Sequence, residues 1–269
     1  RQHHHVDQVA QDAPPPQTLE IAAVAHRIGG AATEVGSVVA GGGEHALRLI
    51  RGLAERPGSD VRLYGIFDDR DDVRSPPQVL GLPKLGGYDD LMSFIRKSEV
   101  DMVIEAVFER LDVKRAVFEQ LDKMLKPDAV LASNTSYIDI DEISSVTNRR
   151  KHVLGLHFFS PANIMKLLEI VVPQCAADDV VATGFALAKI LGKIPVRAGN
   201  SPGFIGNRIL GKYGDCAAHM MEDGATPYEI DAAIVEFGYP MGLHAMYDLA
   251  GLDIGWDNRK AAKGKRNPA

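Results

Sequence analysis

One histidine in this sequence stands in a setting that suits proton transfer. His157 lies in the string GLHFFSP, residues 155–161, and a second string, MKLLE, follows at residues 165–169. Histidine can act as an acid or a base near neutral pH, and a secondary alcohol that loses a hydride needs a base to take its hydroxyl proton. None of the other histidines has a comparable context. His157 is therefore the candidate base.

A glycine-rich turn earlier in the chain points to phosphate binding. Gly41, Gly43 and Ala46 fit the pattern G-x-G-x-x-G/A between an apolar run and a helical pattern. In such a turn the backbone can approach a pyrophosphate, and the helix N-terminus supplies N–H groups. Asp68 is the candidate partner of the ribose hydroxyls, although it lies beyond the usual spacing of about 20 residues. Glu44 is unfavourable beside a phosphate, and a turn that binds nothing is the alternative.

The hydrophobic patterns predict a Rossmann-like, doubly wound parallel sheet followed by a short helical domain. Strands that alternate with helices are typical of such α/β folds. The segment 18–28 fits a helix or a strand, and the proline- and glycine-rich stretch 74–87 is expected to be a loop. The expected strands are residues 37–40, 61–67, 100–107, 129–132, 153–159, 167–172 and 194–197. The expected helices are residues 44–56, 88–97, 111–125, 179–191, 204–222, 227–236 and 246–249.

Composition limits the classes of partner. The formal net charge is −6 and no basic run dominates, so nucleic acid is not an expected partner. No apolar run reaches the roughly 18 residues of a membrane span. The two cysteines, Cys175 and Cys216, form no metal-ligand spacing and no disulfide framework, which favours the cytoplasm and no bound metal. We expect a disordered lead-in (1–18), a nucleotide-binding domain (19–199), a helical domain (200–259) and a frayed tail (260–269).

Residues 101–256 resemble the NAD-dependent 3-hydroxyacyl-CoA dehydrogenases. Besides the two strings around His157, the resemblance rests on VIEAVFE (103–109), SNTS (133–136), NSPGFIGNR (200–208), and GYPMG (238–242) with DLAGLD (248–253). It implies that a hydride passes from C3 of an (S)-3-hydroxyacyl-CoA to NAD, as in fatty acid β-oxidation. The family has proline where Leu243 stands. Because monofunctional members continue for several more helices, we expect a truncated helical domain.

The resemblance also implies roles for individual residues. His157 would be the base and Glu169 the carboxylate that orients it, while Ser136 and Asn207 would bond to the reacting oxygen. The family's cofactor-lining positions correspond here to Ala106, Val107, Glu109, Lys114 and Asn134. Read singly, these residues also suit a buried strand, a turn or a helix surface. The family further implies a homodimer formed through the helical domain.

A second resemblance covers residues 35–103. The strings SVVAGGGEHALRLIRGL and VRLYGIFDDR are similar to the N-terminal Rossmann-like module of bacterial polyprenyl sugar-phosphate transferases. We therefore predict a junction of two families near residue 101. Two alternatives to the dehydrogenase stay open: a nucleotide- or sugar-nucleotide-binding module, and an inactive chimeric fragment.

Overall fold

The chain folds into two compact units, residues 1–200 and 201–269. The computed structural model describes residues 21–24, 35–40, 61–67, 77–79, 81–97, 100–106, 109–159, 162 and 164–250. Four residues of the predicted cofactor site, Gly41, Gly43, Asp68 and Val107, lie outside the described residues.

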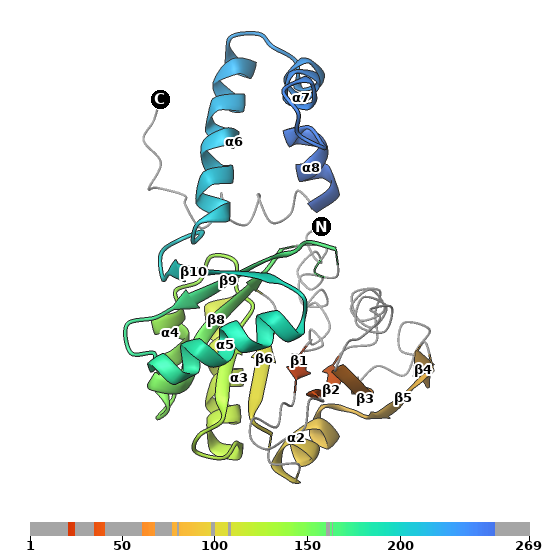
Figure 1. The fold of residues 1–269 in the computed structure, drawn as a ribbon, viewed down its shortest axis with the longest axis vertical. Coiled ribbons are helices and arrows are strands. Elements are labelled where there is room, and N and C mark those ends of the chain that lie inside the picture. Colours follow the sequence, from red (N-terminus) through yellow and green to blue (C-terminus); the bar gives the residue numbers. More distant parts are fainter. Residues whose placement is uncertain are drawn as a thin grey trace, which may run out of the picture. The chain divides into compact units, whose positions relative to one another are not determined.

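The described strands of the first unit form one sheet (Figure 1) in the order β10-β9-β8-β7-β6-β1-β2-β3-β5-β4. Neighbours β2–β3, β3–β5, β6–β7, β7–β8 and β9–β10 are parallel. This confirms the predicted α/β, Rossmann-like class. The strands are β1 (Ile21–Val24), β2 (Val35–Ala40), β3 (Val61–Phe67), β4 (Gln78–Val79), β5 (Leu82–Gly86), β6 (Met102–Glu105), β7 (Val130–Ser133), β8 (Val153–Phe158), β9 (Leu167–Val172) and β10 (Ile194–Gly199).

Helices cover both faces of the sheet around β8. The helices are α2 (Tyr88–Lys97), α3 (Leu111–Met124), α4 (Ile140–Ser144) and α5 (Asp178–Ile190), with a 3-10 turn at Arg150–His152. Successive residues of a strand point to opposite faces. Leu154 lies beneath Gly184 of α5, while a Cβ on Gly155 would meet Ile140 of α4 at 3.1 Å. The interior between these layers is aliphatic, and β6 and β7 are buried along their whole length.

Three features of the sheet depart from the sequence prediction. The stretch 74–87, expected to be a loop, contains β4 and β5, where Pro83 and Gly86 argue against a strand. Pairing with β3 offsets that preference, since Ile66 lies opposite Lys84 and Phe67 opposite Gly86. Strand β9 is antiparallel to β8, and β1 is antiparallel to both of its neighbours. Tertiary pairing thus outweighs local propensity here.

Strand β1 lies between β6 and β2, the strand that precedes the glycine turn. Ile21 pairs with Glu105 at the carboxyl end of β6, and Ala22 pairs with Val39 of β2. Neighbouring strands lie about 4.8 Å apart, so β2 and β6 are roughly 10 Å apart instead of adjacent. In doubly wound sheets a dinucleotide binds at the carboxyl ends where the strand order reverses. The inserted strand therefore lies at the edge where a cofactor would bind.

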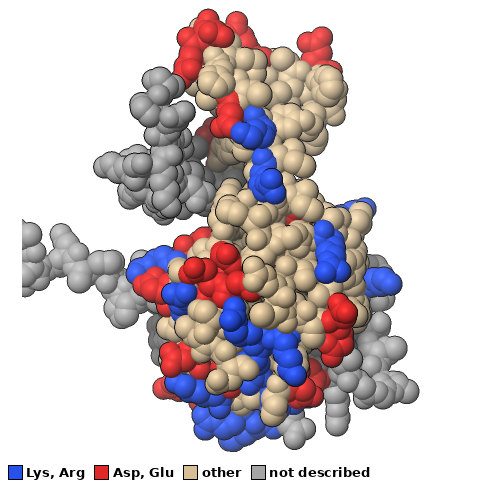
Figure 2. All heavy atoms as spheres, turned by 90° about the vertical axis from the view of Figure 1, so that its left-hand side faces the viewer, with Lys and Arg blue, Asp and Glu red and all other residues tan. Residues whose placement is uncertain are grey.

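Charged side chains of the first unit form local pairs. Figure 2 shows acidic and basic residues interspersed over the face it presents, with no single-sign field over all of it. A buried pair joins Arg149 to Asp122 of α3, with Nε and Oδ1 2.7 Å apart. Burial of Asp122 opposes its ionisation, but the hydrogen bonds from Arg149 and Asn148 and the charge of Arg149 outweigh burial and lower the pKa of Asp122.

The described part of the second unit, residues 201–250, is helical. It contains α6 (Gly206–Glu222), α7 (Pro227–Glu236) and α8 (Leu243–Ala250), packed around Ala217, Ile230 and Leu243. Burial of Asp231 opposes its ionisation, but the amide groups of α8's first turn donate to it and lower its pKa. No described helix is long and apolar enough to cross a membrane.

The first helix of this unit begins later than predicted. Gly203 and Phe204 have φ values of 71° and 48°, which are left-handed and cannot continue into an α-helix. Helix α6 therefore starts at Gly206, two residues after the predicted start.

Candidate active site

His157 and Glu169 form a buried pair on two adjacent strands. They lie directly opposite each other in the antiparallel register of β8 and β9. Their Nδ1 and Oε2 atoms are 2.7 Å apart, and the side chains are 4% and 1% exposed. Because the carboxylate engages Nδ1, proton exchange with a substrate would use Nε2. The arrangement suits a general base whose protonated form is stabilised by a neighbouring charge.

Local packing fixes the orientation of this pair. The next residues along both strands are apolar and buried or half-buried on the opposite face, as strand alternation requires. The Phe159 ring lies 4.5 Å from the His157 ring, at an angle of 51°. Lys193 Nζ donates to the carbonyl oxygen of Met165 at 2.7 Å and also to that of Ala162. These bonds tie the connection between β8 and β9 to Lys193, the residue before β10.

The segment after β7 joins the ends of three strands. The amide of Asn134 donates to the Glu105 carbonyl at 2.8 Å, and its side-chain oxygen accepts from the Phe158 amide at 2.9 Å. Phe158 directly follows the candidate base. Asn134 therefore connects β6, β7 and β8 at their carboxyl ends, which is where ligands bind in folds of this class.

Glu109 holds the residues that follow Asn134. Its Oε1 atom accepts hydrogen bonds from the Thr135 hydroxyl, the Ser136 amide and the Tyr137 amide at 2.5, 2.9 and 3.0 Å. Such bonds to an ionised acceptor are stronger than those between neutral groups. The backbone that carries Ser136 is thus fixed by one carboxylate.

Glu105, Lys114 and Ser133 form a buried charge cluster, which contacts Glu109 through Lys114. Glu105 Oε1 accepts from Lys114 Nζ at 2.8 Å, and its Oε2 accepts from Ser133 Oγ at 2.7 Å. The side chains of Glu105 and Lys114 are at most 1% exposed. The family resemblance implied a cofactor-lining role for Lys114 but no role for Glu105. A carboxylate inside an apolar strand was the signal that could have revealed it.

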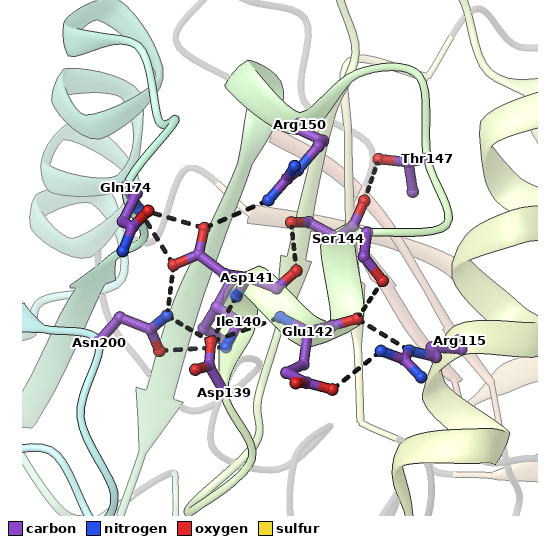
Figure 3. A network of polar contacts seen from close by, with 11 residues as sticks. Arg115, Asp139, Ile140, Asp141, Glu142, Ser144, Thr147, Arg150, Gln174 and Asn200 are labelled. Carbon is purple, nitrogen blue, oxygen red and sulfur yellow. Dashed lines mark hydrogen bonds and ion pairs between the residues drawn. The ribbon is translucent and has the colours of Figure 1, made fainter.

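Asn200 secures the other end of the segment (Figure 3). Asp139 caps α4 by accepting from the amides of Asp141 and Glu142. The Asn200 side chain donates to Asp139 Oδ1 at 2.6 Å and to Asp141 Oδ2 at 2.8 Å, and accepts from the Ile140 amide at 3.1 Å. One amide therefore bridges two carboxylates and the helix start. Sequence reasoning missed this role of Asn200.

The structure gathers most of the predicted site residues at one edge of the sheet. Ala106 follows β6, Asn134 follows β7, and His157 and Glu169 lie near the same edge on β8 and β9. Glu109 approaches from the turn before α3, and Lys114 approaches from α3 itself. Asn207 lies in the second unit, at the start of α6, so its role stays a prediction. Among the described residues, no group of three His, Cys, Asp or Glu side chains could hold a metal.

The donor set at this edge fits a nicotinamide dinucleotide. Polar side chains and backbone groups converge at the carboxyl ends of β6, β7 and β8, as the rule for dinucleotide sites requires. Ala106, the residue that follows β6, is small and half-buried. The assignment of individual residues to the cofactor remains a prediction.

Family models match nearly all of the chain. The NAD binding domain of 3-hydroxyacyl-CoA dehydrogenase matches residues 85–201, and the C-terminal domain of that family matches residues 203–268. These matches confirm the resemblance of residues 101–256. A model described as a CoA-binding domain matches residues 18–108, the region for which a second family was predicted. The CoA-binding model and the NAD binding model overlap around the predicted junction near residue 101.

Curated relatives and solved structures agree with this family. Over 187 residues the chain is 46% identical to the peroxisomal bifunctional enzyme of Homo sapiens, covering 69% of this chain and 26% of that protein. The zebrafish (Danio rerio) enzyme of the same name is 48% identical over 162 residues, 60% of this chain and 23% of that protein. The chain thus spans about a quarter of the curated relatives it matches.

Among solved structures, FadB2 of M. tuberculosis superposes with a TM-score of 0.68 and 31% identity, covering 83% of this chain and 84% of that one. The (S)-3-hydroxybutyryl-CoA dehydrogenase PaaH1 of Ralstonia eutropha gives a TM-score of 0.55 and 36% identity, covering 62% and 59%. The resemblance therefore extends to the fold as well as to the motifs. This chain belongs to the 3-hydroxyacyl-CoA dehydrogenase family.

Proposed function

We propose that the chain catalyses the reversible oxidation of an (S)-3-hydroxyacyl-CoA at C3, with NAD as the hydride acceptor. The observation that carries the proposal is the buried His157–Glu169 pair, with 2.7 Å between Nδ1 and Oε2, at the carboxyl edge of a Rossmann-like sheet. That edge also presents Asn134 and the segment carrying Ser136. The matched models and the relatives named above support the same chemistry.

In this proposal the histidine moves one proton. Bound NAD supplies the acceptor for the hydride that leaves C3. His157 takes the hydroxyl proton through Nε2, and the negative charge of Glu169 stabilises the imidazolium that forms. Ser136 and Asn207 bond to the reacting oxygen. In the reverse direction the imidazolium returns its proton to the oxygen of the 3-oxo group.

The cofactor is proposed to lie along the ends of β6 and β7. NAD is named in the description of the family model that matches residues 85–201. Ala106, Glu109, Lys114 and Asn134 are the described residues proposed to line its nicotinamide side. The glycine turn is proposed to take the pyrophosphate and Asp68 the ribose.

A direct spectrophotometric assay tests the proposal. NADH oxidation is followed with acetoacetyl-CoA for the wild type, for His157→Gln and for His219→Gln. His219 is a matched control because it also pairs with a glutamate, but its side chain is 74% exposed. We expect activity in the wild type and the control, and loss of activity with retained folding in His157→Gln. Turnover by His157→Gln near the wild-type rate would remove the base from the mechanism.

A second candidate is a nucleotide-binding module without dehydrogenase activity. It is favoured by the match of residues 18–108 to a CoA-binding domain and by the insertion of β1 between β2 and β6. Calorimetric titration with NADH, free CoA and UDP-sugars separates the two candidates. Binding of CoA or a UDP-sugar without NADH binding would favour the second.

Two further proposals concern the cellular compartment and the oligomeric state of the chain. We propose a reducing compartment such as the cytoplasm, because both cysteines are free and exposed. The curated relatives named above are peroxisomal, so fluorescence microscopy of the tagged chain should decide between the two. We also propose a homodimer through the helical unit, where Ile209 and Phe237 are 56% and 84% exposed. Analytical ultracentrifugation that finds only monomer at micromolar concentration would contradict this.

A further inference from the structure

Glu105 is a fully buried carboxylate that the mechanism above does not use. It ends β6 and is 0% exposed. Each of its oxygens has a partner from a different element: Lys114 Nζ from α3 at 2.8 Å, and Ser133 Oγ from β7 at 2.7 Å. The residue therefore ties a helix and a strand to the end of β6.

The burial of these charges makes the cluster rigid. A buried ion is stable only when it is paired and hydrogen-bonded, and loss of one partner leaves an uncompensated charge. Lys114 is buried to the same degree as Glu105, so neither side chain can leave the other without a large penalty. The ammonium group of Lys114 is consequently held at one place, between Glu105 and Glu109.

The cluster is continuous with the segment that carries Ser136. Lys114 Nζ lies 3.5 Å from Glu109 Oε2, and the other oxygen of Glu109 accepts from the Ser136 amide. The backbone of Glu105 acts on the same segment, because its carbonyl accepts from the Asn134 amide at 2.8 Å. The side chain of Glu105 acts on the segment through Lys114 and Glu109, and its backbone carbonyl acts through Asn134. Both groups thus lead to residues proposed to contact the nicotinamide and the substrate.

We propose that Glu105 is a positioning residue for the reaction. Its charge fixes Lys114, Lys114 fixes Glu109, and Glu109 holds Ser136 in the geometry required by the reacting oxygen. This inference rests on the proposed dehydrogenase function, but it also predicts a property of the resting protein that can be measured without turnover.

The test compares Glu105→Gln with Asp122→Asn. Both changes neutralise a buried carboxylate that pairs with a cation, and both pairs involve α3. The Asp122 pair is a matched control because Arg149 also bonds to carbonyl groups at the C-terminal end of that helix, away from the Ser136 segment. Both variants should melt at a lower temperature than the wild type.

Only Glu105→Gln should affect the site. We expect its kcat with acetoacetyl-CoA to fall on the order of 100-fold, because a displacement of about 1 Å can cost that much, and its KM for NADH to rise. Hydrogen exchange of residues 134–138 should become faster in Glu105→Gln and stay unchanged in Asp122→Asn. Equal losses of stability, with kcat, KM and exchange of this segment unchanged in both variants, would overturn the proposal.

A second variant and a second readout allow the test to be completed if Glu105→Gln does not fold or the wild type is inactive. If Glu105→Gln does not fold, Ser133→Ala removes one donor to the same carboxylate and should give a smaller change in the same direction. If the wild type neither binds NADH nor turns over, the proposed function fails, and the exchange of residues 134–138 alone decides whether Glu105 positions the segment. Unchanged exchange in the folded variants would then reject it.

Discussion

The substitution Glu169→Gln tests the electrostatic role of the carboxylate separately from its shape. Glutamine keeps the size of the side chain and one oxygen that can accept from Nδ1, but it lacks the charge. The wild-type contact is 2.7 Å and both side chains are almost completely buried, so water screens the interaction little. The variant should fold, and its NADH affinity should be retained.

The expected effect can be estimated from this geometry. With the centres of the two charges about 4 Å apart and an effective dielectric constant of about 20, the attraction is about 4 kcal/mol. This term appears only when His157 is protonated along the reaction path. Because about 1.4 kcal/mol corresponds to a tenfold change in rate, kcat for hydroxyacyl oxidation should fall roughly 1000-fold. If the amide presents its NH2 group to the ring, the tautomer reverses and the loss grows toward about 10⁴-fold.

The assay is steady-state oxidation of (S)-3-hydroxybutyryl-CoA, followed by NADH absorbance, with NADH affinity measured separately by fluorescence. Glu222→Gln is the matched control, since Glu222 pairs with an exposed histidine at 3.3 Å, and its kcat should equal that of the wild type. A Glu169→Gln variant that is folded and retains nearly the full kcat would refute the assigned role of the carboxylate.

Substitutions at three other positions have outcomes that follow from the structure. Asn200→Asp should lower the melting temperature more than Asn200→Ala at pH 7, because it places a third carboxylate between two others; equal melting temperatures for the two variants would contradict this. Gly155→Ala should cost about 1–3 kcal/mol in urea unfolding, because its Cβ would lie 2.7 Å from the Cβ of Val171; an unchanged midpoint would contradict that packing. Arg149 lowers the pKa of Asp122 in the folded state. The pair therefore stabilises the folded protein at pH values above the unfolded pKa of about 4, and this stabilisation is lost as the pH falls through the folded-state pKa of Asp122. The difference in unfolding free energy between wild type and Asp122→Asn should therefore be larger at pH 7 than at pH 3, and a pH-independent difference would oppose this account.

The sequence patterns predicted elements whose own periodicity is strong. Helix α3 and strands β8 and β9 each carry a clear apolar pattern, and their bounds in the structure differ from the predicted ones by at most one residue. Strand β5 was missed because Pro83 and Gly86 disfavour strands locally, while its pairing with β3 is a long-range effect. The position of β1 was also hidden, because alternation along a strand does not reveal its neighbours.

Some residues of the candidate site were likewise predicted from the sequence, and others were missed. The strings around His157 predicted an acid–base histidine, and the family resemblance supplied Glu169 as its partner. Glu105 and Asn200 were missed because their partners are far away in the sequence and belong to other elements. A single carboxylate at the end of an apolar strand, or an asparagine after a strand, gives no local indication of which groups it will meet.

The most direct test of the central claim follows the hydride and the proton-transfer group together. Acetoacetyl-CoA is reduced with NADH that carries deuterium at the transferred position of C4, and the product is analysed by mass spectrometry. The account predicts one deuterium at C3 of 3-hydroxybutyryl-CoA with the wild type and no labelled product above background with His157→Gln. Product without deuterium, or equally rapid labelling by the variant, would contradict it.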